Sequence, residues 1–207
     1  MEKYFQQYAN YCILENREPV SIGEFCRASE IDAEEFLKHF KSVEELRNGL
    51  LNSCIENLHI RLSGDKEFQE FSFREKLMTY YFGLFESLLP YRTYLIQRYK
   101  SWKKVPDRQN EWRKFYKLHV DYIDQLIQAA CATGELQRRN GLEAYSAKGF
   151  QLVFTYLLRV WMNDESQDFT TTDAAIEKSI HLSVSLLEPS SLDALVDFGK
   201  FAFSTKV

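Results

Sequence analysis

The chain has 207 residues, of which 45% are hydrophobic and 27% charged, and this ordinary globular usage excludes wholesale disorder, a collagen fold and a coiled-coil fibre. Glycine (8) and proline (4) are scarce, and so few turn-forming residues are typical of an all-α protein. The formal net charge is −4, and residues 1–47 hold the whole excess because six Lys/Arg face ten Asp/Glu there.

The N-terminal part of the chain contains three consecutive helix-start signals. In each, a short side-chain oxygen can accept a hydrogen bond from a first-turn amide, while an acid three residues later reaches back toward the cap. Helices are therefore predicted to begin near residues 22, 33 and 43, after a first helix over residues 3–16. The helices that begin near residues 22 and 33 must be short, because each ends before the next helix starts. Two such short helices in succession predict a helix-turn-helix unit. The three signals are Ser21-x-x-Glu24, Asp32-x-x-Glu35 and Ser42-x-x-Glu45.

The rest of the chain is predicted to be a bundle of longer helices, whose ends follow from apolar periodicity and from Gly and Pro breakers. We expect a front unit of residues 1–47 and an all-helical body of residues 48–207 that share the helix beginning at residue 43. Loops are expected up to residue 70 and over 164–170. The predicted helices cover residues 43–62, 72–88, 91–102, 107–133, 142–163, 172–187 and 191–203.

Residues 20–26 (VSIGEFC), Ile31-Asp32 and residues 37–46 (LKHFKSVEEL) give the front unit a continuous pattern of helix, turn, short helix and acidic helix start. This pattern resembles the N-terminal DNA-binding domain of the TetR family of bacterial repressors. The resemblance implies a TetR-like fold, with a three-helix helix-turn-helix unit on a larger ligand-binding and dimerisation domain. It also implies a homodimer that binds a palindromic operator.

The sequence departs from the family pattern at the turn, in the second short helix and at the start of the helix predicted from residue 43. Glu30 stands where the family usually has Gly, and Ser29 precedes it, so we expect a less tight turn. Leu37 replaces a frequent Tyr. Val43 replaces a frequent Lys that normally holds the DNA backbone, which predicts the loss of one phosphate contact.

The second short helix carries acids on its solvent-facing side. Glu34 and Glu35 would face a polyanion, and the charge of the front unit has the wrong sign for an electrostatic footprint on DNA. A carboxylate can, however, accept a hydrogen bond from cytosine N4 in the major groove. The DNA contacts implied by the resemblance are Ser21, Ala33, Glu34, Lys38, His39 and Lys41.

Residues 91–117 combine many aromatic side chains with nine bases against two acids. This mixture is compatible with nucleic acid or anionic lipid, but the helical spacing of the aromatics favours two amphipathic helices with aromatic inner faces. In a TetR-like body these helices would border a cavity for a small apolar or aromatic ligand, whose anionic group would meet Arg92 or Arg98. The hypothetical lining residues are Tyr80, Tyr81, Phe85, Arg92, Tyr94, Arg98, Tyr99 and Trp102.

The late helices are apolar over more than one stripe, which suggests a second buried surface besides the core. By the resemblance this surface is a dimer interface, and the alternative is that these residues form the core of a single chain. The predicted interface residues are Phe154, Leu158, Trp161, Ile180, Val184, Leu187, Leu195 and Phe198.

No motif for an enzyme, a metal site or a cofactor is visible, so none of these is expected. The N-terminal residues lack a signal-peptide core and no stretch is long and apolar enough to span a membrane, which predicts a cytoplasmic protein. The cysteines show no CxxC spacing and the histidines are isolated: Cys12, Cys26, Cys54 and Cys131, and His39, His59, His119 and His181.

Two functions remain open at this point. The preferred one is a ligand-responsive DNA-binding transcriptional regulator, a repressor, that acts as a homodimer. The alternative is a TetR-fold protein that binds an apolar ligand or lipid and has lost DNA binding. The acidic front unit, Val43 and the aromatic body favour this alternative.

Overall fold

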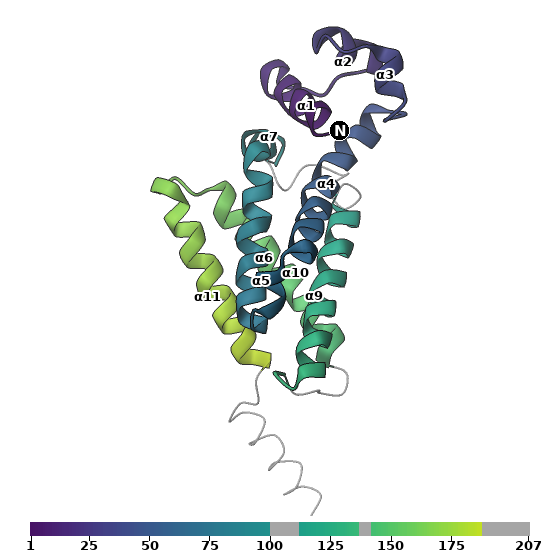
Figure 1. The fold of residues 1–207 in the computed structure, drawn as a ribbon. Coiled ribbons are helices and arrows are strands. Elements are labelled where there is room, and N and C mark those ends of the chain that lie inside the picture. The colour runs from purple at the N-terminus through teal and green to yellow at the C-terminus, as the bar shows by residue number, and fades with distance from the viewer. Residues whose placement is uncertain (100–111, 137–141, 188–207) are drawn as a thin grey trace, which may run out of the picture.

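The computed structural model describes residues 1–99, 112–136 and 142–187, and every regular element in these ranges is a helix. The all-α fold class is therefore confirmed. Residues 1–47, here called the head, form one end of the molecule, and α4 runs from the head into the bundle formed by the later residues, here called the body (Figure 1). The elements are α1 (Glu2–Glu15), α2 (Ile22–Ala28), α3 (Ala33–Leu37), α4 (Val43–Gly64), α5 (Lys66–Glu70), α6 (Phe73–Leu88), η1 (Leu89–Tyr91), α7 (Arg92–Tyr99), α9 (Arg113–Thr133), α10 (Leu142–Met162), η2 (Gln167–Phe169) and α11 (Thr170–Leu187).

The starts of α2, α3 and α4 confirm the predicted helix starts at residues 22, 33 and 43. Ser21, Asp32 and Ser42 each accept a hydrogen bond from the amide three residues later, at 3.2, 2.8 and 3.0 Å. Glu24 and Glu45 reach one residue further back than predicted, since they accept from the amide that precedes the cap, at 2.6 and 2.7 Å. Local side-chain capping thus fixes the ends of the helix-turn-helix elements.

The predicted loop after α4 contains the short helix α5, so this part of the prediction is wrong. Asp65 ends α4 and caps α5, because its carboxylate accepts from the amides of Glu67 and Phe68 at 2.9 and 3.2 Å. Phe68 then buries its ring in the core, which ties α5 to the body. The segment 164–170 also contains a short helix, η2. The predicted helix over 191–203, and residues 100–111 of the helices predicted over 91–102 and 107–133, lie outside the described residues.

The turn between α2 and α3 closes tightly although it lacks glycine, which corrects the expectation of a less tight turn. Glu30 adopts the left-handed conformation, with φ 54°. The amide of Ile31 donates to the carbonyl oxygen of Cys26 at 2.8 Å, and the amide of Ser29 donates to that of Phe25 at 2.9 Å. The turn therefore keeps a geometry that glycine adopts with less strain.

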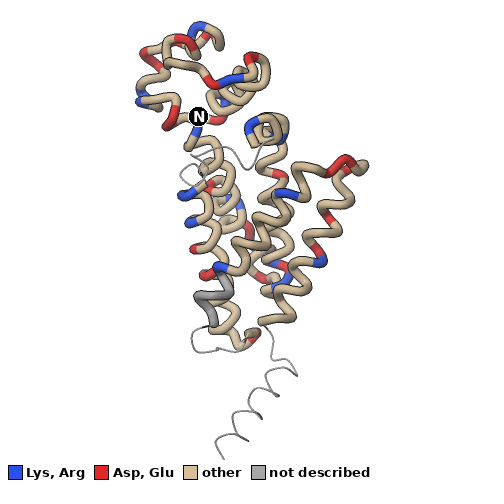
Figure 2. The backbone as a smooth tube through the Cα atoms, turned by 180° about the vertical axis from the view of Figure 1, so that it is seen from behind, with Lys and Arg blue, Asp and Glu red and all other residues tan. Residues whose placement is uncertain are grey.

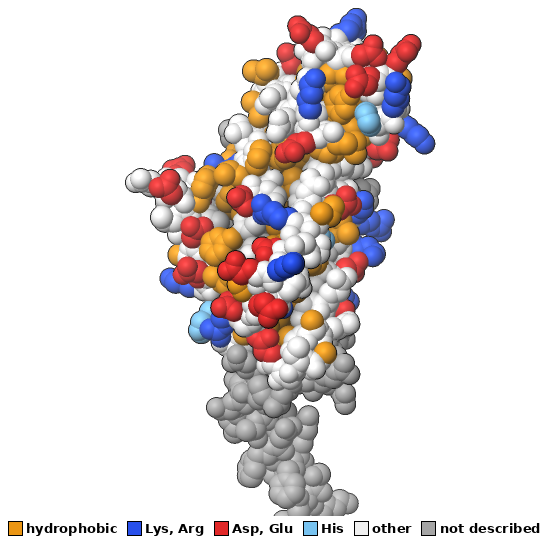
Figure 3. Space-filling view, in the orientation of Figure 1, with side chains coloured by type: hydrophobic (Ala, Val, Ile, Leu, Met, Phe, Trp, Pro, Cys, Tyr) orange, Lys and Arg blue, Asp and Glu red, His pale blue; other side chains and the backbone are white. Residues whose placement is uncertain are grey.

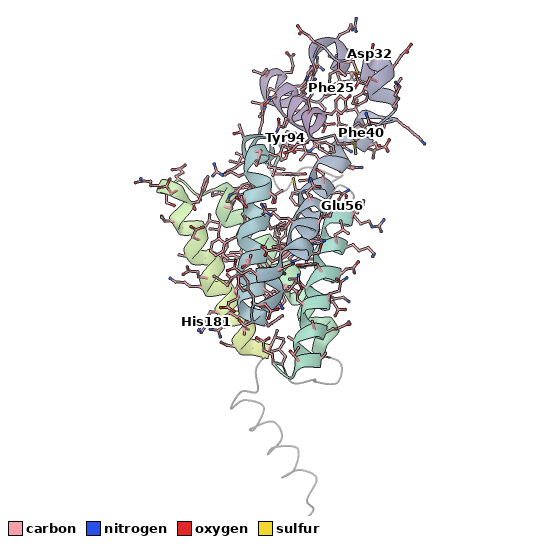
Figure 4. The ribbon with its side chains drawn as sticks, viewed as in Figure 1. Phe25, Asp32, Phe40, Glu56, Tyr94 and His181 are labelled. Carbon is pink, nitrogen blue, oxygen red and sulfur yellow. The ribbon has the colours of Figure 1, made fainter. Side chains whose placement is uncertain are left out.

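Edge-to-face aromatic pairs form the interior of the head. Phe25 and Phe36 are fully buried with ring centroids 5.6 Å apart, and Tyr8 packs against Phe25 at 6.1 Å. Phe40 packs against Phe36 in a tilted arrangement, with ring centroids 5.4 Å apart, and belongs to the same cluster. Figure 4 shows Phe25 of α2 and Phe40, in the segment between α3 and α4, pointing into the head. These contacts hold α3 at a fixed orientation relative to α1 and α2.

The body is a helical bundle in which α10 packs against α9 and α11, and α6 packs against α4 and α11. Its aromatic core includes Phe115, Phe154 and Trp161, all buried. In the ranges that the structure describes, no helix combines the length and apolarity needed to cross a membrane. The body thus places α7, the helix that follows α6 and η1, against α1 of the head.

Candidate functional site

The helix-turn-helix presents its second helix to solvent. All the DNA contacts implied by the sequence lie on the outside of the head, although Ser21 also uses its hydroxyl to cap α2. Lys38, His39 and Lys41 follow directly after α3 and are exposed, and the ring of His39 lies 5.6 Å from that of Tyr4. Ala33 and Glu34 are exposed at the start of the same helix. The predicted set thus shares one accessible end of the molecule.

The acidity of α3 has a local structural reason. Asp32 caps this helix, and Glu34 and Glu35 lie in its first turn. Carboxylates at that position stabilise a helix N-terminus, where unpaired amides give a partial positive charge. Figure 2 shows acidic positions recurring along the head backbone among few basic ones. In the sequence, Lys38 and Lys41 are the basic residues nearest to the end of α3. They lie between two acids before them and two acids after them, Glu34 and Glu35, and Glu44 and Glu45.

A charged contact that sequence reasoning missed joins the head to the body. Glu18, in the segment between α1 and α2, pairs with Arg98 of α7 and, at 3.2 Å, with Arg47 of α4. The side chains of Arg98 and Arg47 are only 15% and 12% exposed, and that of Glu18 is 32% exposed. One carboxylate therefore connects two helices at a site that is partly shielded from water.

A polar and an aromatic contact reinforce the same junction. Gln97 of α7 donates to the carbonyl oxygen of Cys12 at 3.4 Å and to Oδ1 of Asn16 at 2.5 Å. One turn earlier, Tyr94 packs edge-to-face on Tyr8 of α1, with ring centroids 5.8 Å apart. Figure 4 shows Tyr94 at the end of α7 nearest to the head. Sequence reasoning assigned Tyr94 and Arg98 to a ligand cavity, and the structure places both at this junction, where they line a small pocket of about 140 Å³.

Tyr80 and Tyr81, two other predicted lining residues, belong to a closed polar cluster in the body core. Both are fully buried, and their hydroxyls lie 2.8 and 3.3 Å from Nδ1 and Nε2 of His119. Tyr81 donates to the carbonyl oxygen of Phe150 at 3.1 Å, and Nε2 of His119 lies 3.3 Å from the same oxygen. Nε2 is thus the protonated nitrogen, and Nδ1 accepts from Tyr80. Burial lowers the pKa of His119 to about 4, so the ring stays neutral.

The remaining predicted lining residues are also spread over several environments. Arg92 donates to the carbonyl oxygens of Trp161 and Asp164 at 3.0 and 2.8 Å, and so satisfies the C-terminal end of α10. Tyr99 accepts a hydrogen bond from Nε1 of Trp112 at 2.9 Å. Trp102 lies outside the described residues. Among the predicted positions that the structure describes, only Phe85 lines the groove described next, so these positions do not surround one cavity.

A groove of about 660 Å³ lies between the C-terminal end of α4, α6, η2 and α11. Its floor is aromatic and aliphatic, and Figure 3 shows hydrophobic side chains on this face of the body with acidic ones beside them. Such a volume suits a small organic ligand. The aromatic lining residues are Phe82, Phe85, Trp161 and Phe169, and the acidic ones are Asp65, Glu86, Asp168 and Asp173.

The predicted dimer residues require a correction, because the structure buries most of them inside the single chain. Apolar periodicity identified the face of α10 and α11 that turns inward, which is the alternative weighed in the sequence analysis. Phe154, Leu158, Trp161, Ile180 and Val184 are between 0% and 3% exposed. Leu187 is partly buried, and Leu195 and Phe198 lie outside the described residues.

Comparison with known proteins decides the family. The model of the tetracyclin repressor-like C-terminal domain matches residues 76–202. The chain belongs to the TetR family. A search of curated protein sequences gives no match.

Solved structures of TetR-family regulators share the fold at low sequence identity. A regulator from Syntrophomonas wolfei superposes with a TM-score of 0.70 at 14% identity, over 90% of this chain and 93% of that one. The regulator PfmR from Thermus thermophilus gives 0.55 at 14% identity, over 90% and 96% of the two chains. A regulator from Mesorhizobium loti gives 0.58 at 15% identity, over 89% and 95%. The TetR fold therefore spans head and body together.

Proposed function

We propose that this TetR-family chain is a ligand-responsive repressor that acts in the cytoplasm as a homodimer on a palindromic operator. The observation that carries the proposal is the exposed end of α3, where Lys38, His39 and Lys41 follow a helix that a tight turn joins to α2. In a helix-turn-helix protein the second helix enters the major groove, and nearby basic side chains neutralise DNA phosphates. The aromatic interior of the head holds this helix in one orientation, as base readout requires.

The dimer part of the proposal rests on apolar side chains that the body leaves exposed. Leu152 and Tyr156 of α10 are 73% and 55% exposed, and Leu182 and Leu186 of α11 are 60% and 67% exposed. Each pair is spaced by one helical turn, and α10 packs against α11. Covering such side chains with a second copy would remove apolar surface from water. The resulting two-fold dimer would present two heads to the two halves of a palindromic operator.

The ligand response would act through α6 and α7. The groove is lined by Phe85, Glu86 and Leu89, at the end of α6 and the start of η1, and α7 follows directly. Because α7 carries Arg98 and Tyr94 to the head, a ligand that favours one position of α6 over another would change the placement of the head.

Retention of genomic DNA fragments by the purified protein at two salt concentrations tests the proposal, with the region upstream of its own gene included. We expect one discrete fragment, bound less tightly at high salt. Lys38→Ala and Lys41→Ala should each weaken binding and lower the slope of log K against log salt by about 1. Lys66→Ala, on α5 in the body, is the matched control and should leave binding unchanged. A folded protein that retains no DNA at low salt would refute DNA binding.

A second candidate is a TetR-fold carrier of an apolar ligand or lipid that no longer binds DNA. The exposed carboxylates of Glu34 and Glu35 on α3 favour it, because they would face phosphates. In the same experiment, this candidate predicts no retained fragment at either salt concentration.

A further inference from the structure

We propose that the groove between α4, α6 and α11 binds a small organic cation with an aromatic or aliphatic body. The inference deepens the ligand response of the proposed function and rests on that function for its regulatory meaning. Binding itself can be measured without DNA.

The floor of the groove offers aromatic surface for the body of such a ligand. Phe82 is partly buried, and Phe85 and Trp161 are buried with ring centroids 5.5 Å apart. Gly83 lies on the same helix, and a Cβ there would approach Leu58 to 2.8 Å, so α6 sits close against α4 beside the groove. A volume of about 660 Å³ leaves room for several aromatic rings.

The walls carry more negative than positive charge. Of the described residues, four with carboxylates and one with a guanidinium line the groove, and Arg61 is paired with Glu86 at 3.0 Å. Asp65 is engaged as the cap of α5. Asp168 and Asp173 are the acids left over, and among the described residues no hydrogen bond or ion pair engages either carboxylate. The unbalanced charge at the groove is therefore negative.

Asp173 is the acid best placed to attract a cation. It lies in the first turn of α11 and is partly buried. Burial raises the pKa of its carboxyl, and the nearby charges of Glu177 and Asp164 raise it further. A cation next to Asp173 would relieve both effects, because it supplies the opposite charge at a site with reduced access to water.

The protein already holds one cation against rings of this groove. The guanidinium carbon of Arg92 lies 5.6 Å from the centroid of Trp161 and 5.1 Å from that of Phe169. Aromatic faces attract cations through their negative quadrupole. The same arginine donates to carbonyl oxygens at the end of α10, and Arg98 is paired with Glu18, so both guanidiniums expected to meet an anionic ligand group have partners within the chain. The preference for a positive ligand therefore rests on the carboxylates of Asp168 and Asp173, and no guanidinium expected at an anionic ligand group is left for that role.

A pair of ions of similar shape and opposite charge tests the proposal. We would titrate the DNA-free, full-length protein with tetraphenylphosphonium and with tetraphenylborate in a calorimeter. We expect saturable binding of one phosphonium per chain and no saturable binding of the borate. Asp173→Asn should weaken phosphonium binding about tenfold, as for the loss of one charged contact. The control is Glu177→Gln, one turn along α11 and exposed, which removes a charge near Asp173 that does not line the groove and should weaken binding much less.

Phe82→Leu provides a second variant, since it shortens the aromatic floor without introducing a charge. Affinity should fall for the phosphonium, and melting curves show whether each variant is folded. Equal binding of the borate, absence of saturable phosphonium binding, or equal effects of the Asp173 and Glu177 variants would each overturn the proposal. Phosphonium binding by a protein that retains no genomic DNA would reject the regulator and keep the groove, whereas the opposite result would reject the groove alone.

Discussion

The carboxylate of Glu18 in the head pairs with the guanidinium of Arg98 in the body, although the two residues are 80 positions apart in the sequence. Arg47 of α4 binds the same carboxylate from the other side. The junction therefore links α7 to both the segment after α1 and the first turns of α4, which are the two chain segments on which the orientation of α3 depends.

Glu18→Gln should lower the free energy of unfolding by about 1–2 kcal/mol, between the values typical of exposed and buried ion pairs. The exposed Glu15→Gln, three residues earlier, should change it little. Urea denaturation measures both, and a double-mutant cycle with Arg98→Met isolates the pair. Purely additive effects in that cycle would mean that the pair contributes nothing to stability.

Replacement of Glu30 by glycine should stabilise the protein. Glu30 has φ 54°, a conformation that costs other residues more than glycine. We expect Glu30→Gly to raise the free energy of unfolding by about 0.5–1 kcal/mol, because relief of strain outweighs the extra flexibility of the unfolded chain. The neighbouring Ser29 has φ −99°, so Ser29→Gly should lower stability instead. A gain of the same size in both variants would contradict this explanation.

Stability should fall as the pH drops from about 6.5 toward 4, because burial lowers the pKa of His59 and of His119 to about 4 each. Between these values the unfolded chain binds more protons than the folded one, so acid favours unfolding. His59→Phe keeps a ring stacked on Tyr122, now 4.2 Å away, and removes one titrating group. At pH 4.5 it should recover about 1–2 kcal/mol, a value reduced for partial exposure.

Chemical denaturation of the parent and variant at pH 7 and pH 4.5 measures this difference. His181→Gln is the control, since His181 is exposed on the outer face of α11, as Figure 4 shows, and the pH dependence should stay unchanged. If the His59→Phe protein lost as much stability in acid as the parent, desolvation of His59 would not contribute.

The exposed leucines of α10 and α11 should control the oligomeric state. Leu152→Glu and Leu182→Glu should each convert a dimer into a folded monomer, because both positions are open to solvent in the single chain and a dimer would bury the new charge. Light scattering at micromolar concentration measures the mass. Leu14→Glu, at an equally exposed position on the head, should leave the dimer intact. A monomeric parent protein would rule out the dimer.

The helix-turn-helix could be predicted closely because its signals are local. Ser21, Asp32 and Ser42 each cap the helix that begins at the next residue, and the bonds involved span three residues. A helix as short as α5 has too few residues to show periodicity, although Asp65 followed by Phe68 carries a cap and an anchor for it. The turn at Glu30 was mispredicted because tertiary packing enforced a backbone conformation that the residue type disfavours.

The candidate site could be predicted only in part, because an apolar or aromatic stripe does not tell a cavity wall from a core. Tyr80 forms a hydrogen bond with His119, 39 positions away in the sequence. This long-range contact makes Tyr80 a buried structural residue. The same ambiguity assigned Phe154 and Trp161 to a dimer interface. The most strongly apolar face of a helix turns toward its own core first, so a second surface has to be sought among the leucines left outside it.

The acids that open α3 bear on how such a protein would find its operator. Attraction to DNA of any sequence comes from Lys and Arg side chains that neutralise phosphates, and this attraction lets proteins slide along the duplex. A head that carries six bases against ten acids has little of that attraction. A regulator of this kind would reach its target by repeated collisions from solution, so operator occupancy would follow the number of copies in the cell rather than the length of DNA scanned.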